Sequence, residues 1–268
     1  MNSLKLIEEA TRVVLSAGEL LAAEWRRQGG PRGYGDKADV DIEIEVRLRA
    51  DLLAILACDF WGEETGSQLT GHEYCWVVDP NDGTSDFLGG RKGSAVSVGL
   101  LHNEKPFLGV VYAPVLESRD PDCISWVSGL EGVMRNGKVI SNDLRSQQLT
   151  RGSQVLVSSA AAGKPELNAE LCAPAGFVPM PSIAYRLACV AAGDAVACAS
   201  LVPVSAHDVV AGHALLLGAR GVLVDQDGVS VSYKSKAHMA RVSLKCFGGA
   251  PMACKELVSR KWGKLFSV

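Results

Sequence analysis

Apolar residues near the amino terminus recur at the spacing of one helix face. Leu4, Ile7 and Val14 share one side of the segment 1–25, and the positions between them are mostly polar or acidic. Because a secretory signal needs a basic start and an unbroken apolar block, this segment is predicted to be an ordinary amphipathic helix. A charged, glycine-rich loop follows it, and a second helix is predicted over residues 42–56.

Short apolar runs with strand-like composition begin at Trp76. The runs "AVSVGLL" and "FLGVVYAPV" flank the polar stretch "HNEK", which predicts a β-hairpin. The stretch "GVMRNGKVIS" contains Asn136 and Gly137, a pair that favours a tight turn between two strands. Hairpins are therefore predicted to dominate this part of the chain.

The composition changes near residue 150, where a polar stretch precedes a new series of alternating strands and helices. We therefore predict an amino-terminal α+β subdomain over residues 1–150 and a carboxy-terminal α/β subdomain over residues 151–268. In the second of these, "SAHDVVAGHALLLGARG" is predicted to be a helix with Ser205 as its N-cap and Asp208 at its third position. Glycines mark the end of that helix.

The overall composition excludes several classes of protein. The 268 residues are 47% hydrophobic and 21% charged, and the net charge of −3 gives no basic surface for a nucleic-acid polymer or an anionic membrane. Charged residues interrupt the most apolar segment, so no membrane span is predicted. The eight cysteines include no C-x-x-C pair, and they are predicted to be reduced in a cytoplasmic protein.

The sequence "DPNDGTSDF" places two acids directly after the apolar run "WVV". Asp79 and Asp82 are expected at the end of a buried strand, where two carboxylates that lie close together need a cation between them. Oxygen ligands of this kind select Mg²⁺, Mn²⁺ or Ca²⁺. Gly83 and Thr84 let the backbone turn sharply and present N–H groups at the same point, which suits a phosphate. A surface turn capped by aspartates is the alternative interpretation.

Two familiar acidic motifs can be compared by spacing. An EF-hand calcium loop that began at Asp79 would need glycine and glutamate at positions that hold Thr84 and Gly90, so this motif is excluded. Haloacid-dehalogenase-like phosphatases have one residue between two acids, the first of which is the nucleophile, whereas two residues separate Asp79 from Asp82. A covalent aspartyl-phosphate mechanism therefore stays open as a less favoured alternative.

Three segments of the chain together resemble the signature segments of the inositol monophosphatase family: "WGEETG", "WVVDPNDGTSDF" and "SAHDVVAGHALL". They occur in the family's order, and the resemblance extends over nearly the whole chain. It implies an α/β (α+β) fold, a layered α/β/α/β/α sandwich of two fused subdomains that is commonly dimeric. It also implies a Mg²⁺-dependent, lithium-sensitive phosphatase, so we expect a homodimer with Mg²⁺ as its cofactor.

The resemblance also implies a set of metal ligands. Glu63, Asp79 and the backbone carbonyl of Asn81 match the ligands of a first Mg²⁺, and Asp79, Asp82 and Asp208 match those of a second. A third, weaker ion lies near Glu63 in the family, and Mn²⁺ is an alternative to Mg²⁺. Since the carbonyl of Asn81 does the binding, its side chain is expected to matter little.

The catalytic residues that the resemblance implies are Thr84, Asp41 and Glu63. Thr84 and Asp41 match the pair that orients and deprotonates a water for direct attack on phosphorus, without a phosphoenzyme. Glu63 would act with the weaker ion beside it.

The predicted substrate-binding residues surround the phosphate and its neighbourhood. The N–H groups of Gly83 and Thr84 would hold the phosphate at a helix start, and Arg91 is the candidate for contact with an additional anionic group. The full set is Asp82, Gly83, Thr84, Asp208 and Arg91.

Three positions depart from the family pattern. His207 stands where the family usually has tryptophan, and it is predicted to have a structural role. The loop before Asp41 is shortened, so Lys37 and Asp39 would complete the third metal site only in part. Leu201 stands where inositol-specific members carry an acid that contacts the sugar alcohol.

These observations predict a Mg²⁺-dependent phosphomonoesterase that hydrolyses a small phosphorylated polyol such as inositol monophosphate by means of a metal-activated water. A 3′(2′),5′-bisphosphate nucleotidase is one alternative. A catalytically idle family member that binds a metal or phosphate as a regulator is another. In each case the predicted partner is a small-molecule phosphate ester.

Overall fold

Eight α-helices occur among residues 2–266, the part of the chain that this computed structural model describes. The two longest confirm the helices predicted near the amino terminus. The helices are α1 (Ser3–Trp25), α2 (Asp39–Ile55), α3 (Thr84–Leu88), α4 (Pro165–Cys172), α5 (Ile183–Ala191), α6 (Ala206–Gly218), α7 (Lys236–Ala240) and α8 (Pro251–Val258). Three 3₁₀ turns accompany them: η1 (Leu144–Ser146), η2 (Ser159–Gly163) and η3 (Trp262–Phe266).

The larger sheet has eight strands in the order β10-β9-β8-β7-β6-β5-β3-β4. All neighbouring strands are antiparallel except β3 and β5, which run parallel. Its strands are β3 (Asp59–Gly62), β4 (Ser67–Gln68), β5 (Tyr74–Asp82), β6 (Ala95–His102), β7 (Lys105–Ala113), β8 (Asp122–Val127), β9 (Val133–Arg135) and β10 (Lys138–Ile140). A separate two-stranded hairpin, β1 (Gly33–Tyr34) and β2 (Lys37–Ala38), precedes α2.

The smaller sheet has five strands in the order β12-β11-β13-β15-β14. It is mixed, because β11 runs parallel to both of its neighbours whereas β15 runs antiparallel to both of its own. Its strands are β11 (Gln154–Ser158), β12 (Gly176–Met180), β13 (Ala197–Ser200), β14 (Val222–Asp225) and β15 (Cys246–Gly249).

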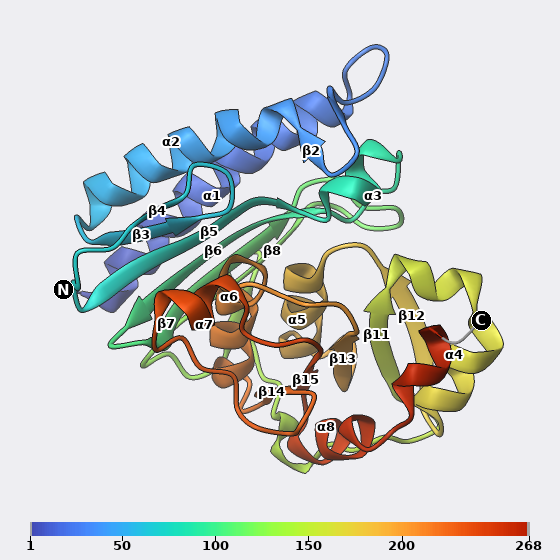
Figure 1. Cartoon of the computed structure of the whole chain (residues 1–268). Helices are drawn as coiled ribbons and strands as arrows, with labels where there is room; N and C mark the ends of the chain where they lie inside the picture. The colour runs from blue at the N-terminus through green and yellow to red at the C-terminus, as the bar shows by residue number, and fades with distance from the viewer. Residues whose placement is uncertain (1, 267–268) are drawn as a thin grey trace.

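These elements stack in five layers (Figure 1). Helices α1 and α2 cover one face of the larger sheet, and α5 and α6 lie between the two sheets. Helices α4 and α8 cover the outer face of the smaller sheet. The order of layers is therefore α/β/α/β/α, and the predicted fold class is confirmed.

Helix α6 is buried on nearly all sides because a sheet lies on each side of it. It approaches the larger sheet so closely that only glycine fits opposite it. A Cβ atom built on Gly109 of β7 would lie 2.3 Å from the carbonyl oxygen of Ala211, and one on Gly99 of β6 would lie 2.5 Å from Val210. These two glycines allow α6 to lie this close to the larger sheet. They thereby determine the position of Asp208, which is in the first turn of that helix.

The two predicted tight turns are present. Asn103 and Glu104 connect β6 to β7 with φ of 49° and 63°, and Asn136 and Gly137 connect β9 to β10 with φ of 50° and 76°. Positive φ at both central residues matches the twist of the flanking antiparallel strands.

Three further predictions concern the cysteines, membrane spans and the division into subdomains. All eight cysteines are free, and among the described residues no helix is both long enough and apolar enough to cross a membrane. The proposed division near residue 150 stays a prediction. The apolar core between the sheets contains residues from both sides of that position.

Candidate metal and phosphate site

The acids of "DPNDGTSDF" lie at the end of β5, where its pairing with β6 shifts in register between Asp79 and Asp82. Asp79, Asn81 and Asp82 are 2%, 1% and 7% exposed, so they end a strand that is buried to its last residue. Gly83 then adopts φ of 100° and caps α3, which begins at Thr84. A side chain would be strained at that φ, so the glycine makes the abrupt change from strand to helix possible.

Asp208 approaches the same point from α6. One ligand oxygen each from Asp79, Asp82 and Asp208 lie within 4.8 Å of one another. The predicted N-cap, Ser205, is confirmed, and its N–H donates to Oδ2 of Asp208. Ser205 and Asp208 form a capping box, and the Ser205 hydroxyl also donates to the carbonyl of Ala240. Asp208 is thereby fixed through its Oδ2 beside the two acids of β5.

Asp82 is held in place by residues at the start of α5. Its Oδ2 accepts hydrogen bonds from the Ser182 hydroxyl and the Ala184 N–H, at the amino-terminal end of α5. Arg186, only 3% exposed, donates from Nε to the carbonyl of Ser182 and from Nη1 to the carbonyl of Ala199. The arginine therefore places a buried positive charge behind the aspartate without pairing directly with it.

Glu63 comes from the loop after β3, which Glu45 of α2 holds in place. The Glu45 carboxylate accepts from the N–H groups of Glu64 and Thr65 and from the Thr65 hydroxyl. A Cβ on Gly62 would lie 2.2 Å from Oε1 of Glu45, so glycine is needed for this carboxylate to fit beneath the loop. Glu64 contributes its backbone N–H to this network.

Asp41, at the third position of α2, meets Asn81 and Thr84. The Asn81 Nδ2 donates to Oδ1 of Asp41 at 3.0 Å, and the Thr84 Oγ1 lies 3.1 Å from Oδ2 of Asp41 and 2.8 Å from the carbonyl of Asn81. The Asn81 side chain is therefore one of the groups that position Asp41. Whether it matters little for function stays a prediction.

Burial in one acidic cluster raises the pKa values of these carboxyl groups. Desolvation is the largest cause in each case, and it raises the pKa of Asp41, Asp82 and Asp208 to about 6 and that of Glu63 to about 8. The neighbouring acids raise it further for Glu63 and Asp82. The pKa of Asp79 is raised well above its ordinary value, first by burial and then by the charge of Glu63. Buried carboxylates with hard oxygen donors fit a divalent cation such as Mg²⁺, which would remove this mutual repulsion.

His207 also faces the cluster, although it was predicted to be structural. Its Nε2 lies 3.9 Å from Oε1 of Glu63 and 3.9 Å from Oδ2 of Asp208. The second histidine of α6, His213, is buried elsewhere and has its Nδ1 3.0 Å from the Tyr233 hydroxyl, which is a structural contact.

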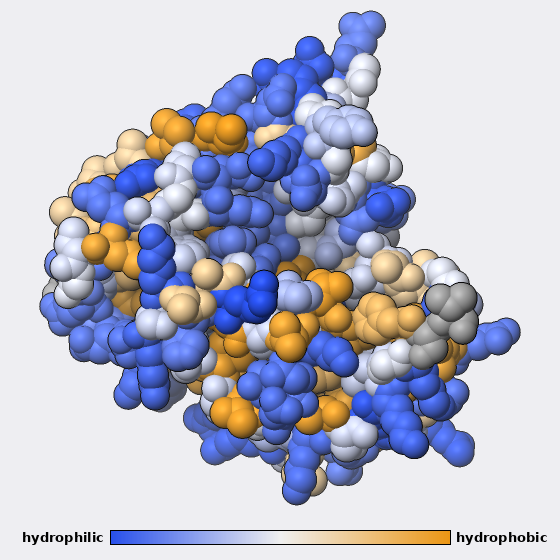
Figure 2. Space-filling model, viewed as in Figure 1, coloured by the Kyte–Doolittle hydropathy of each residue, from blue (hydrophilic) through white to orange (hydrophobic). Residues whose placement is uncertain are grey.

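Arg91 lies just beyond α3 and is only partly available. Its Nε forms an ion pair with Asp86, which also accepts a hydrogen bond from Ser159 at 2.7 Å, while its guanidinium remains 58% exposed. The molecule is indented on the side between the part that carries α3 and the part that carries β11 and β12 (Figure 2). Lys37, on the shortened loop before Asp41, is exposed and lies near enough to Glu64 to oppose the rise in the pKa of that carboxyl group.

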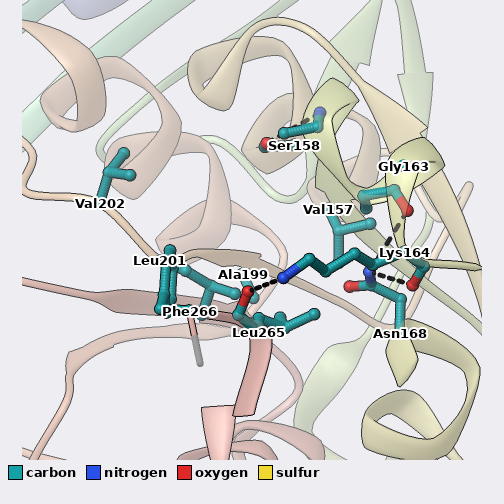
Figure 3. Close-up of a pocket in the computed structure, with 12 residues that line it drawn as sticks. Val157, Ser158, Gly163, Lys164, Asn168, Ala199, Leu201, Val202, Leu265 and Phe266 are labelled. Atoms are coloured by element: carbon teal, nitrogen blue, oxygen red, sulfur yellow. Dashed lines mark hydrogen bonds between the residues drawn. The ribbon is translucent and has the colours of Figure 1, made fainter. Parts of the chain in front are cut away.

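Leu201 does not join the acidic cluster directly but lines a separate cavity of about 310 Å³ (Figure 3). The cavity is mostly apolar, with Val157, Val202 and Phe266 among its walls. Lys164 is the one charged group among the described residues that line it, and it donates from Nζ to the carbonyl of Leu265 at 2.7 Å (Figure 3).

Several residues of the site escaped the interpretation of the sequence. Glu45, Ser182 and Arg186 all hold predicted ligands or their loops. The pattern "DIEIE", which begins at Asp41 and resembles the family's D-x-x-x-E, ends at Glu45, but no role at the site was assigned to any of the three. Only Glu45 had a visible signal, since it lies four positions after Asp41 and so on the same face of a helix. Ser182 and Arg186 belong to a segment whose relation to Asp82 depends on the tertiary fold.

Comparison with known proteins places the chain in a family. A model of the inositol monophosphatase family matches residues 4–250. The chain is 31% identical over 116 residues to a probable inositol 1-monophosphatase ImpA of Mycobacterium tuberculosis, covering 42% of this chain and 43% of that protein. It is 32% identical over 145 residues to a fructose-1,6-bisphosphatase/inositol-1-monophosphatase of Aquifex aeolicus, covering 52% and 53%. The chain thus spans about half the length of the curated relatives it matches.

Solved structures share the fold over nearly the whole chain. The inositol monophosphatase from Anabaena sp. PCC 7120 superposes with a TM-score of 0.73 at 24% identity, covering 96% of this chain and 95% of that one. A Thermotoga maritima IMPase gives a TM-score of 0.76 at 20% identity, with 96% of each chain covered. Because the family model matches all but the ends of the sequence, the chain belongs to the inositol monophosphatase family.

Proposed function

We propose that this protein is a Mg²⁺-dependent phosphomonoesterase that hydrolyses a small phosphorylated polyol such as inositol monophosphate. The observation that carries the proposal is the meeting of Glu63, Asp79, Asp82 and Asp208 beside the Thr84–Asp41 pair. The names of the relatives, which include inositol monophosphatases, support the same reaction class.

The proposed ligands divide between two ions. Glu63, Asp79 and the carbonyl of Asn81 would hold one Mg²⁺, and Asp79, Asp82 and Asp208 would hold the other. Bound there, Mg²⁺ supplies charge that neutralises the phosphoryl oxygens and lowers the pKa of a water. The N–H groups of Gly83 and Thr84 would orient the phosphate at the start of α3.

Thr84 and Asp41 would handle the proton of the attacking water. The Thr84 hydroxyl has one hydrogen, and if it donates that hydrogen to Asp41 its oxygen is free to accept from a water. Attack would form a bond from the water oxygen to phosphorus as the bond to the alcohol oxygen breaks. One water proton would pass through the Thr84 hydroxyl to Asp41, and the departing alcohol oxygen would take up a proton from solvent, to which Asp41 later returns its own. The products are the free alcohol and inorganic phosphate.

The proposed enzyme has low specificity for the alcohol part of its substrate. Leu201 offers no charge-assisted acceptor to the hydroxyls of a polyol, and such a contact is worth roughly 1.5–3 kcal/mol. Modest discrimination among small phosphomonoesters follows, and a bisphosphate is a second candidate class. The exposed face of Arg91 and the name of the Aquifex relative, which includes fructose-1,6-bisphosphatase, favour that second class.

The proposal is tested by phosphate release from a panel that contains inositol 1-phosphate, sugar phosphates, fructose 1,6-bisphosphate and 3′-phosphoadenosine 5′-phosphate. Each is measured with Mg²⁺ and with a chelator, for the parent protein and for Asp79→Asn. Turnover that needs both Mg²⁺ and Asp79 supports the proposal. Background rates throughout, together with retained Mg²⁺ or phosphate binding, would instead indicate an idle regulator, and a trappable aspartyl-phosphate would indicate the covalent alternative.

A further inference from the structure

We propose that His207 supplies an imidazole nitrogen to the metal position of Glu63 and Asp79, so that this position prefers a first-row transition ion such as Mn²⁺ to Mg²⁺. The inference rests on the metal site of the proposed function and deepens it by naming the ion. It starts from the position of the imidazole among the acids.

His207 is the second residue of α6, directly before Asp208, and its side chain is 16% exposed. One ligand atom each from Glu63, Asp79 and His207 lie within 4.8 Å of one another. The close packing of α6 against the larger sheet and the hydrogen bond between Ser205 and Asp208 hold this part of the helix in place. The imidazole is therefore held at the edge of the carboxylate cluster by the same contacts that hold a proposed ligand.

The ring is not satisfied by the protein groups around it. Nδ1 is buried without a hydrogen-bond partner among the described residues. Nε2 lies 3.9 Å from Glu63 and from Asp208, beyond the 2.7–3.2 Å of an ordinary N–H···O hydrogen bond. With the ring proton on Nδ1, the lone pair of Nε2 faces the carboxylates of Glu63 and Asp208 and is not used in a hydrogen bond to either.

A cation between the three side chains would account for the position of Nε2. Metal–nitrogen and metal–oxygen bonds of about 2.0–2.2 Å place two donors on one ion roughly 3 Å apart when adjacent and at most about 4.4 Å apart. The separation of 3.9 Å between Nε2 and Oε1 of Glu63 lies inside this range, although it is too long for a direct hydrogen bond.

The donor set determines which ion benefits. Mg²⁺ binds oxygen almost exclusively, whereas imidazole nitrogen adds affinity for Mn²⁺, Fe²⁺, Co²⁺ and Zn²⁺. The group of Asp79, Asp82 and Asp208 contains oxygen donors only, so the second position stays suited to Mg²⁺. The site would then hold two different ions.

Manganese is the probe of choice because thiols compete for softer ions and this chain has eight free cysteines. Binding of Mn²⁺ and of Mg²⁺ is measured by calorimetry for the parent, for His207→Asn and for His238→Asn. His207→Asn exchanges a nitrogen donor for an amide oxygen in a smaller side chain, and His238 is an exposed histidine on α7 outside both metal groups. Thermal unfolding without metal shows whether each variant keeps its fold.

We expect His207→Asn to weaken Mn²⁺ binding at one position roughly tenfold or more, the size of effect seen when metal-site groups are removed. Its Mg²⁺ affinity should change less than about threefold, and His238→Asn should behave as the parent. Pulsed electron paramagnetic resonance of the Mn²⁺-loaded parent should show modulation from a coordinated ¹⁴N that disappears only in His207→Asn.

Two results would overturn the inference while leaving the proposed function intact. One is a parent protein that binds Mn²⁺ without ¹⁴N modulation. The other is a His207→Asn variant that retains both the modulation and the Mn²⁺ affinity. A parent protein that binds neither Mn²⁺ nor Mg²⁺ contradicts the metal site itself, and both proposals fail together.

Discussion

The side-chain Nδ2 of Asn81 donates a 3.0 Å hydrogen bond to Oδ1 of Asp41, and so joins the end of β5 to the first turn of α2. Burial raises the pKa of Asp41 to about 6, and this hydrogen bond opposes the rise. The asparagine therefore helps to keep Asp41 ionised near neutral pH, which the proposed role of Asp41 as a proton acceptor requires.

Asn81→Leu removes that donor and retains the backbone carbonyl. A hydrogen bond to a charged group is worth about 1.5–3 kcal/mol, or roughly one pKa unit or more, so the acidic limb of the kcat–pH profile should move upward by about one unit. The dependence of the rate on Mg²⁺ should not change, because the carbonyl ligand is still present. An acidic limb that coincides with that of the parent contradicts the role of the side chain.

Asp79→Asn, Asp82→Asn and Asp208→Asn should each abolish activity while the fold is retained. Each change removes charge from a cluster that would bind cations, and relief of repulsion should stabilise the metal-free protein. Phosphate release at saturating Mg²⁺ and thermal unfolding without metal are the measurements. Asp227→Asn, at an exposed turn, is the matched control and should match the parent. Near-normal turnover in any of the three would remove that residue from the metal site.

Thr84→Ala should lower kcat by about 10² to 10⁴ and leave phosphate affinity nearly unchanged. Assistance by a base is typically worth that much, whereas the N–H of Thr84, which would hold the phosphate, is preserved. Thr84→Ser keeps the hydroxyl and should retain most of the rate. The pair is compared by kcat and by inhibition with inorganic phosphate. Equal rates for Thr84→Ala and Thr84→Ser would show that the hydroxyl has no part in the reaction.

The stabilisation that Mg²⁺ provides should grow as the pH rises from 5 to 7.5. In the metal-free folded protein, Asp82 and Asp208 have pKa values of about 6 against an ordinary value of 3.8, so the folded state binds more protons than the unfolded state between these values. Stability from this source is complete below pH 4 and is lost as the pH rises through 6. Mg²⁺ replaces those protons and restores it.

The measured quantity is the difference in melting temperature with Mg²⁺ and with chelator at each pH. Taking this difference removes contributions that do not depend on the metal, such as that of His213, whose pKa is lowered to about 4 by burial. We expect an increase of a few degrees in the difference between pH 5 and 7.5, roughly 2–4 °C for each kcal/mol. A difference that is constant or that falls with pH contradicts the assignment of these acids to a metal.

Arg91→Ala should weaken turnover of bisphosphate substrates and spare monophosphates. The guanidinium is held beside α3 by Asp86 yet remains partly exposed, so it can meet a second phosphate without contact with the first. KM values for fructose 1,6-bisphosphate and inositol 1-phosphate are compared in both proteins, and Lys92→Ala, which removes the neighbouring cation, is the control. Equal losses for both substrates would mean that Arg91 supports the fold of α3 and does not read the substrate.

Much of this site could be predicted from the sequence because its central parts are local. Asp79, Asp82 and Thr84 lie within six residues, and Asp208 lies in a helix whose apolar pattern and cap are visible in the chain. The period of the apolar residues likewise predicted α1 and the hairpins, since strand and helix repeats differ.

The supports of the site could not be predicted in the same way. The hydrogen bonds from Ser182 and Ala184 to Asp82 join residues that are 100 and 102 positions apart in the sequence. No local sequence pattern predicts a partner at that separation. The contact between the Asn81 side chain and Asp41 was not predicted, for a related reason. It depends on how close α2 lies to the end of β5, a distance fixed by packing rather than by spacing along the chain.

The hydrogen bond between Asp82 and Ser182 also determines at what stage of folding the site can form. Closing a flexible loop of 100 residues costs about 4 kcal/mol in chain entropy, so this contact forms only when the packing of both sheets offsets that loss. During synthesis the acids of β5 emerge long before α5 and α6, and a nascent chain that stops short of residue 208 lacks part of the proposed ligand set. Two fragments of a chain cut between residues 82 and 182 would have to reassociate before either could contribute to a complete centre.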